Sequence, residues 1–182
     1  MQAKSPSAAR DRILSTAHDL FYRYGVRATG IDRVIADSGV TKVTFYRHFP
    51  SKNDLVCAFL EYRHQRWLSW FNDALAHHGQ DIHALVPALT EWFQKKEFRG
   101  CAFINTVGEL AGDLPQVVDI ARRHKDDMTT VIANLLPPSR QRNELSSAIA
   151  VAIDGAIVRA QYEATPKHAL RAVSRIIDAL IQ

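Results

Sequence analysis

Cysteine is scarce in this 182-residue chain, which holds only Cys57 and Cys101. Two cysteines make no disulfide framework, and these two lack the paired spacing of a structural zinc site. No stretch approaches the ~18 apolar residues of a membrane span, and Met1 to Ser7 contain no apolar run of signal-peptide length. We therefore expect a soluble, cytoplasmic protein with no membrane contact, no metal and no cofactor.

Strand patterns are also lacking, since no alternating run longer than four residues lies between turn signals. With 47% apolar and 23% charged side chains, the chain is not a disordered polymer. Apolar residues instead recur at helical spacing, which predicts an all-α fold of about nine helices. Helices are expected at 7–24, in two short pieces within 29–48, over about 25 residues from Ser51, and at about 81–97, 103–111, 114–136, 141–163 and 166–181.

Basic charge is unevenly distributed along the chain. Residues 1–52 hold nine Lys and Arg against four Asp, a net charge of +5, whereas the whole chain carries +4. The remaining residues therefore sum to −1. Such an asymmetry points to a polyanionic partner for the N-terminal segment better than the total charge does.

The segment 29–48 has the dimensions of a helix-turn-helix motif, with two short helices joined at Gly39. Thr29 with Asp32 resembles a capping box at the start of the first helix, and Thr41 is a candidate N-cap of the second. Glycine permits the positive φ of a steep turn between them. The second helix is predicted to expose a polar face, which carries Lys42, Thr44, Tyr46, Arg47 and His48.

Residues 10–56 resemble the TetR/AcrR family of bacterial transcriptional regulators. The run from Tyr46 through His48-Phe49 to Ser51-Lys52 is the most specific part of this resemblance. The other matching residues are Arg12-Ile13-Leu14, Ala17, Leu20-Phe21, Gly25, Thr29, Ile31, Val34-Ile35-Ala36, Ser38-Gly39-Val40-Thr41, Thr44-Phe45 and Leu55.

The resemblance implies a DNA-binding domain at 1–52 and a helical effector-binding and dimerisation domain at 53–182. It implies a homodimer on a pseudo-palindromic double-stranded operator, most often as a repressor that a small, apolar or aromatic effector releases. Lys42, Val43 and Thr44 would face base edges, Lys52 would clamp the backbone, and Val43 stands where many members have a smaller residue. The expected DNA-binding residues are Thr29, Thr41, Lys42, Val43, Thr44, Tyr46, Arg47, His48 and Lys52.

The body offers candidate residues for the other two roles. The expected effector-binding residues are Trp67, Phe71, Trp92, Phe103, Asn105 and Glu109, although aromatic residues at helical spacing equally fit a plain core. The expected dimer-interface residues are Ala148, Ala152, Ile153, Ala156, Val173, Ile177 and Leu180, which fit internal packing as well. Cys101 beside Arg99 is either a reactive thiol or an inert buried one.

No catalytic triad, paired acid and base, or phosphate-binding glycine loop occurs in the sequence, so we expect no enzyme. The alternative to a DNA-binding regulator is a helical ligand-binding or adaptor protein without specific DNA binding. Retention of Lys42, Tyr46, His48 and Lys52 argues against that alternative.

Overall fold

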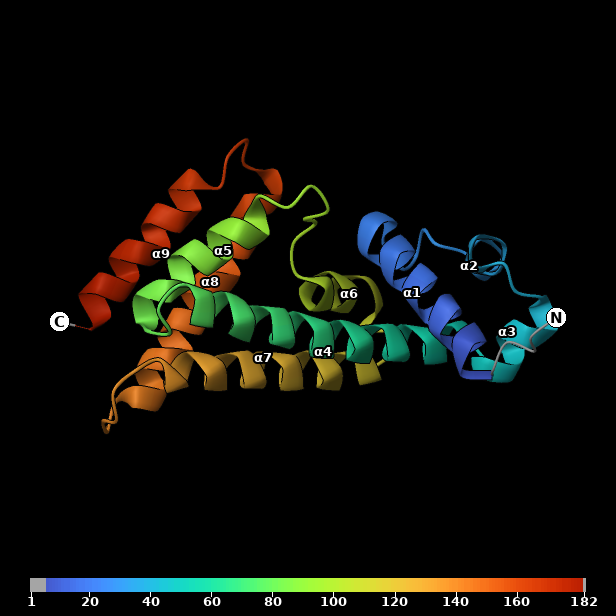
Figure 1. Cartoon of the computed structure of the whole chain (residues 1–182), viewed down its shortest axis with the longest axis horizontal. Coiled ribbons are helices and arrows are strands. Elements are labelled where there is room, and N and C mark those ends of the chain that lie inside the picture. The colour runs from blue at the N-terminus through green and yellow to red at the C-terminus, as the bar shows by residue number, and fades with distance from the viewer. Residues whose placement is uncertain (1–5, 182) are drawn as a thin grey trace. The chain divides into compact units, whose positions relative to one another are not determined.

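The computed structural model describes residues 6–181, which form nine α-helices and a short 3-10 turn, with no strand among them (Figure 1). The all-α prediction is confirmed. The expectation about a signal peptide, and Lys4 with its charge, lie outside the described residues. The helices are α1 (Pro6–Tyr24), α2 (Ile31–Ser38), α3 (Lys42–His48), α4 (Lys52–His77), α5 (Leu85–Phe93), α6 (Ala102–Leu110), α7 (Gln116–Asn134), α8 (Arg142–Tyr162) and α9 (Lys167–Leu180), with the 3-10 turn at Ile82–Ala84.

The chain divides into two compact units. Unit 1 comprises the described residues up to Gln65 together with Ala102–Ala121, and unit 2 comprises Arg66–Cys101 and the described residues from Arg122 onward. The helices α4 and α7 each contribute residues to both units. The expected functional boundary between residues 52 and 53 does not coincide with the boundary between these units, because contacts group the first half of α4 and all of α6 with the helix-turn-helix segment. The division into a DNA-binding and an effector-binding domain at that position therefore stays a prediction.

Unit 1 is built around one apolar face of α1. Ile13, Ala17 and Phe21 recur at helical spacing and are buried, and α1 packs against both α2 and α3. The Phe21 and Phe59 rings meet edge to face with centroids 5.4 Å apart, which joins α1 to α4.

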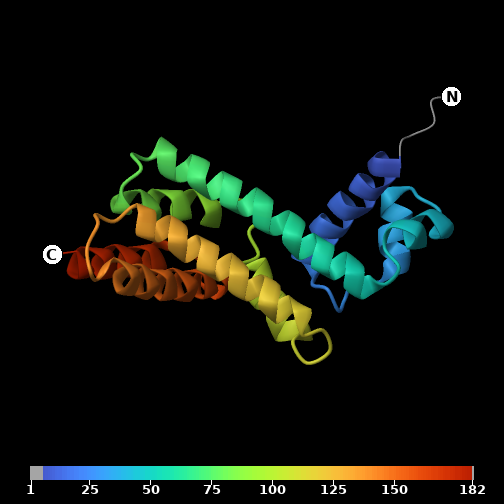
Figure 2. The same cartoon turned by 90° about the horizontal axis from the view of Figure 1, so that it is seen from below.

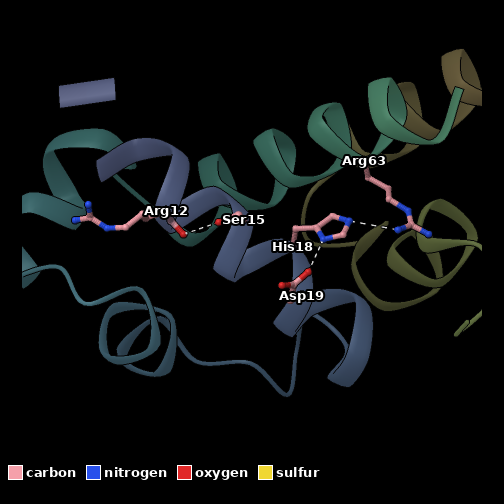
Figure 3. A network of polar contacts seen from close by, with 5 residues as sticks. All are labelled: Arg12, Ser15, His18, Asp19 and Arg63. Carbon is pink, nitrogen blue, oxygen red and sulfur yellow. Dashed lines mark hydrogen bonds and ion pairs between the residues drawn. The ribbon is translucent and has the colours of Figure 1, made fainter. Parts of the chain in front are cut away.

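A polar network on the side of α1 reinforces this packing (Figure 3). His18 Nδ1 lies 2.9 Å from Asp19 Oδ1, and His18 Nε2 lies 3.3 Å from Arg63 Nη1 of α4. Since a carboxylate accepts and a guanidinium donates, this arrangement suits a neutral imidazole protonated at Nδ1. Arg63 also lies 4.0 Å from the centroid of the Tyr22 ring, so α4 holds α1 through both polar and stacking contacts.

The predicted helix starts are mostly confirmed. The Thr41 hydroxyl accepts the Thr44 N–H at 3.2 Å, and the Ser51 hydroxyl accepts the Asp54 N–H at 3.1 Å. The capping box at Thr29 is wrong, because α2 begins at Ile31 after Gly30, with no side-chain cap. Gly39 ends α2 at φ +63°, the left-handed conformation that the turn requires.

Unit 2 is held together by its C-terminal helices. The helices α8 and α9 pack along one another, as Figure 2 shows near the C-terminus, and α5 packs against α9. Ile153 of α8 and Val173 and Ile177 of α9 are buried in the chain itself. Their burial supplies the apolar core of this layer.

Candidate nucleic-acid interface

The helix α3 has one buried side and one exposed side, as a reading helix requires. Phe45 is fully buried and packs against Tyr46 and Phe49, with ring centroids 5.2 and 6.2 Å away. On the outer side, Val43 is 70% and Tyr46 41% exposed. Phe45 therefore fixes the helix, while the neighbouring side chains remain available to a partner.

The basic side chains on this outer side form no ion pairs within the described residues. Lys42 and Arg47 are exposed, and within residues 6–181 neither takes part in an ion pair. Other cations of unit 1 are engaged: Arg33 lies 3.7 Å from Asp37 and stacks on Tyr24. Lys42 opens α3 and Arg47 lies in its last turn. Unpaired cations attract phosphate, and lysine and threonine can reach base edges in a major groove. His48 and Thr44 are half-buried on the same helix.

Thr41 takes part in the helix start. Its hydroxyl caps Thr44 and also lies 3.0 Å from the Thr44 hydroxyl. The pair thus presents two hydroxyl oxygens at the first turn of α3, where the helix N–H groups point outward.

Thr29 points inward, contrary to the expectation that it is a DNA-binding residue. Its side chain is fully buried, its hydroxyl donates to the Gly25 carbonyl at 2.8 Å, and its N–H donates to the Val26 carbonyl at 3.3 Å. Both donors of Thr29 are therefore used to close the α1–α2 loop.

Lys52 stands at the first residue of α4 and is half-buried. Partial burial lowers the pKa of its ammonium group; the Glu109 carboxylate acts in the opposite direction and Arg27 adds to the lowering. Lys52 is thus part of a charged cluster inside unit 1, which the sequence did not indicate.

Three of the expected effector-binding residues meet in unit 2. Trp67 stacks on Phe71 with ring centroids 4.7 Å apart, and Trp92 meets Trp67 edge to face at 5.4 Å. His124 of α7 closes the cluster, with its ring centroid 5.0 Å from that of Trp67. Trp67 is only 5% exposed, and its indole Nε1 has no hydrogen-bond partner.

The other three expected effector-binding residues lie on α6 in unit 1. Phe103 is buried and Asn105 is half-buried. Glu109 is already occupied, because its Oε2 accepts the backbone N–H of Arg27 at 2.7 Å. The structure thus separates the six residues into two groups, and Glu109 is not a free polar group for an effector.

The expected dimer residues also divide. Ile153, Ala156, Val173 and Ile177 are buried in the chain itself, Ala152 and Leu180 are half-buried, and Ala148 is exposed. The large exposed apolar residues of these two helices were not among those expected; they are Val151, Val158, Tyr162 and Ile176.

Sequence reasoning missed Arg27, Asp113 and His124. Arg27 and Glu109 are 82 residues apart, and no local pattern links positions so distant. His124 did carry a signal, because it occupies an apolar position of the 114–136 helix pattern, between Ile120 and Met128. Cys101 is buried, which favours the inert alternative for its thiol.

Two features are absent from residues 6–181. No group of three or more His, Cys, Asp or Glu side chains in this range is arranged to hold a metal ion. None of the helices described here combines the length and the apolarity needed to cross a membrane.

Comparisons with known proteins agree with this geometry. Residues 13–59 match the family model of bacterial regulatory proteins of the tetR family. The chain is 26% identical to the HTH-type transcriptional repressor BepR of Brucella suis biovar 1 over 144 residues, which cover 76% of this chain and 69% of BepR. An uncharacterised HTH-type regulator of Lactococcus lactis is 24% identical over 107 residues, about half of each chain.

Solved structures show the same fold over nearly the whole chain. SCO4454, a TetR-family transcriptional regulator from Streptomyces coelicolor, superimposes with a TM-score of 0.85 and 26% identity, covering 100% of this chain and 98% of that one. The multidrug binding protein EbrR, solved with malachite green, has a TM-score of 0.72 and 18% identity, covering 95% of this chain and 98% of that one.

The helix-turn-helix segment and the comparisons together indicate a transcriptional regulator of the helix-turn-helix class. Residues 13–59 carry the N-terminal domain of the tetR family of bacterial regulatory proteins, and the whole chain resembles TetR-family transcriptional regulators.

Proposed function

We propose that the protein represses transcription as a homodimer bound to a pseudo-palindromic operator, and that a small aromatic effector releases it. The observation that carries the DNA-binding part is α3, where Phe45 is fully buried while Lys42 and Arg47 stay exposed and unpaired within the described residues. A regulator of this kind works on the chromosome, in the bacterial cytoplasm.

A gel-shift titration of promoter fragments, the protein's own included, tests DNA binding. We expect sequence-specific retardation at about 100 mM salt, with affinity that falls steeply as salt rises. If every fragment is bound equally weakly, or not at all, the alternative of a helical ligand-binding or adaptor protein is favoured instead.

The effector site is proposed at the Trp67 cluster of unit 2. A buried indole N–H without a partner costs about 1–3 kcal/mol, and a ligand that brings an acceptor oxygen or nitrogen recovers it. Lys95 lies 4.2 Å from the centroid of the neighbouring Trp70 ring, so the cluster carries a positive charge at its edge. The chemistry therefore favours aromatic molecules with an acceptor or an anionic group.

Isothermal titration calorimetry compares two aromatic probes of opposite charge. We expect 8-anilinonaphthalene-1-sulfonate, which is anionic, to bind more tightly than malachite green, the cationic ligand of the EbrR structure. Trp67→Phe keeps an aromatic ring but removes the N–H, so it should weaken sulfonate binding more than Trp70→Phe does. Equal losses in the two variants would contradict the role of the Trp67 N–H.

For self-association we propose the exposed apolar stripe of α8, rather than its buried face. Val151, Gly155, Val158 and Tyr162 recur at i, i+4, i+7 and i+11, and Val151 and Tyr162 are 73% and 69% exposed. Ala148 begins the same stripe, and Ile176 is the matching exposed apolar residue of α9. Contiguous exposed apolar surface marks an interface, and the same patch on two subunits suits a two-fold dimer.

Sedimentation equilibrium tests this face. Val151→Glu places a charge on the stripe and should give a folded monomer, whereas Asn143→Asp, which adds a charge at an exposed position of the same helix outside the stripe, should leave the dimer intact. A Val151→Glu protein that still sediments as a dimer would move the interface elsewhere.

A further inference from the structure

The α1–α2 loop of unit 1 sets where α2 begins and hence how the helix-turn-helix pair is presented. Its exposed residue Arg27 is bound by a segment that is distant in sequence. The Arg27 N–H donates to Glu109 Oε2 and its Nε–H donates to the Glu109 backbone carbonyl, both at 2.7 Å, while Nη2 pairs with Asp113. We call this set of contacts the Arg27 latch.

The Glu109 carboxylate packs closely against the backbone of the α1–α2 loop at Gly25. A Cβ atom built on Gly25 would lie 3.0 Å from Glu109 Oε1, and Gly25 has φ +87°. The same carboxylate acts electrostatically on Lys52 at the start of α4. One carboxylate therefore faces the end of α1, the loop and the start of α4, all within unit 1.

The three contacts of the latch differ in how strongly they hold the α1–α2 loop. The Arg27–Asp113 pair is well exposed, with side chains 62% and 65% accessible, and such surface pairs contribute little. The bond from Glu109 to the Arg27 N–H is different, since it fixes a backbone position rather than the tip of a flexible side chain. A charge-assisted bond to backbone is also stronger than a neutral one. Glu109 is therefore the main member of the latch.

The chain that leads into α6 is held just as closely, within unit 2. Gln161 of α8 donates from Nε2 to the Arg99 carbonyl at 2.9 Å. Gly100 has φ +82°, and a Cβ atom there would overlap the Gln161 side chain. The segment before α6 is thus fixed within unit 2.

We propose that Glu109 is a positioning residue for DNA binding: through the Arg27 latch, α6 sets the position of α2 and α3 and hence the operator affinity. The proposal rests on the DNA-binding function proposed above.

Fluorescence anisotropy with the retarded promoter fragment tests the latch through Glu109→Ala and Arg27→Ala. Glu109→Ala removes the acceptor of the Arg27 N–H and should bind about tenfold more weakly, within the usual range of coupling between sites. Arg27→Ala keeps this N–H and its bond to Glu109 and loses only the side-chain contacts, so it should lose clearly less affinity than Glu109→Ala. Glu109→Gln keeps an acceptor for the Arg27 N–H and should restore most of the affinity.

General electrostatics predicts a different pattern, which makes the test decisive. Loss of an acidic charge near DNA should strengthen binding, whereas the latch requires Glu109→Ala to weaken it. Loss of a phosphate contact at Arg27 should reduce the salt slope, whereas the latch leaves the slope unchanged. Tighter binding by Glu109→Ala, or a reduced slope in Arg27→Ala, overturns the proposal.

Hydrogen exchange gives a readout independent of DNA. The Arg27 amide should lose protection in Glu109→Ala, while buried amides of α1 keep theirs, which shows that the fold is intact. An unchanged Arg27 amide overturns the latch. Failure of the unsubstituted protein to retard any fragment refutes the proposed function instead, and the exchange result then shows separately whether the latch exists.

Discussion

The residues proposed for function are exposed in unit 1 and buried in unit 2. In unit 1 they are polar and face outward, as Lys42 and Tyr46 do, whereas in unit 2 they are aromatic and buried, as Trp67 and Phe71 are. Substitution in unit 1 should therefore change binding and leave stability alone. Substitution in unit 2 should change both, because there the binding residues are also the core.

The largest difference is expected between Phe71→Ala and Tyr46→Ala. Phe71 is fully buried, so its truncation should lower the free energy of unfolding by about 3–5 kcal/mol. Tyr46 is 41% exposed, so its truncation should change stability by less than about 0.5 kcal/mol while weakening DNA binding on every sequence. Urea denaturation and gel shift measure the two effects. Comparable losses of stability would abolish the contrast.

The next effect separates two glycines of unit 2. Gly79 and Gly100 both have positive φ, but a Cβ atom on Gly79 meets nothing, whereas one on Gly100 overlaps Gln161. Gly79→Ala should cost about 1 kcal/mol from backbone strain, and Gly100→Ala at least about 1–3 kcal/mol more from the displaced side chain. Thermal unfolding of the two variants measures the difference. Equal costs would mean that Gln161 moves aside freely.

A smaller contrast lies within the reading surface itself. Lys42→Ala should reduce discrimination between bases by about 1–3 kcal/mol at one position of each half-site, as loss of a base contact does. Lys52→Ala should instead weaken all sequences alike and lower the salt slope by about one. Binding to a set of single-base operator variants distinguishes them. If Lys52→Ala leaves the salt slope unchanged, Lys52 does not contact the backbone.

The smallest expected effect compares the cysteines, one in each unit. Burial raises the pKa of the Cys57 thiol, and the carboxylates of Asp54 and Glu61 raise it further. A raised pKa leaves less thiolate at any given pH, so Cys57 should react with Ellman's reagent more slowly than free cysteine at pH 8 and faster as pH rises. In the Cys101→Ser variant Cys57 is the only cysteine of the chain, so the measured rate belongs to Cys57 alone. A rate equal to that of free cysteine would show an exposed, unperturbed thiol.

Local signals were enough to predict most of the fold. Helical spacing of apolar residues predicts the nine helices, and the caps at Thr41 and Ser51 depend on residues three positions away. Thr29 shows the limit of such signals. Its sequence context is that of a capping box, but packing buries its side chain and its hydroxyl bonds the Gly25 carbonyl instead.

The exposed site was easier to predict than the contacts between distant segments. The polar side of α3 is encoded within seven residues, whereas Glu109 reaches Arg27 across 82 positions and could not be assigned from either neighbourhood. The helix α8 presented a different difficulty. Apolar residues surround almost its whole circumference, so the sequence did not show whether Ile153 or Val151 faces inward.

The aromatic cluster of unit 2 also makes the protein a selective optical reporter. All three tryptophans of the chain, Trp67, Trp70 and Trp92, lie in this unit and within 6.2 Å of one another by ring centroid. Tryptophan emission therefore reports on unit 2. Unfolding of unit 1 alone changes only tyrosine emission, because unit 1 contributes none of the three tryptophans. Emission and circular dichroism recorded on one sample reveal whether the two units unfold together, since only a single cooperative transition gives coincident curves.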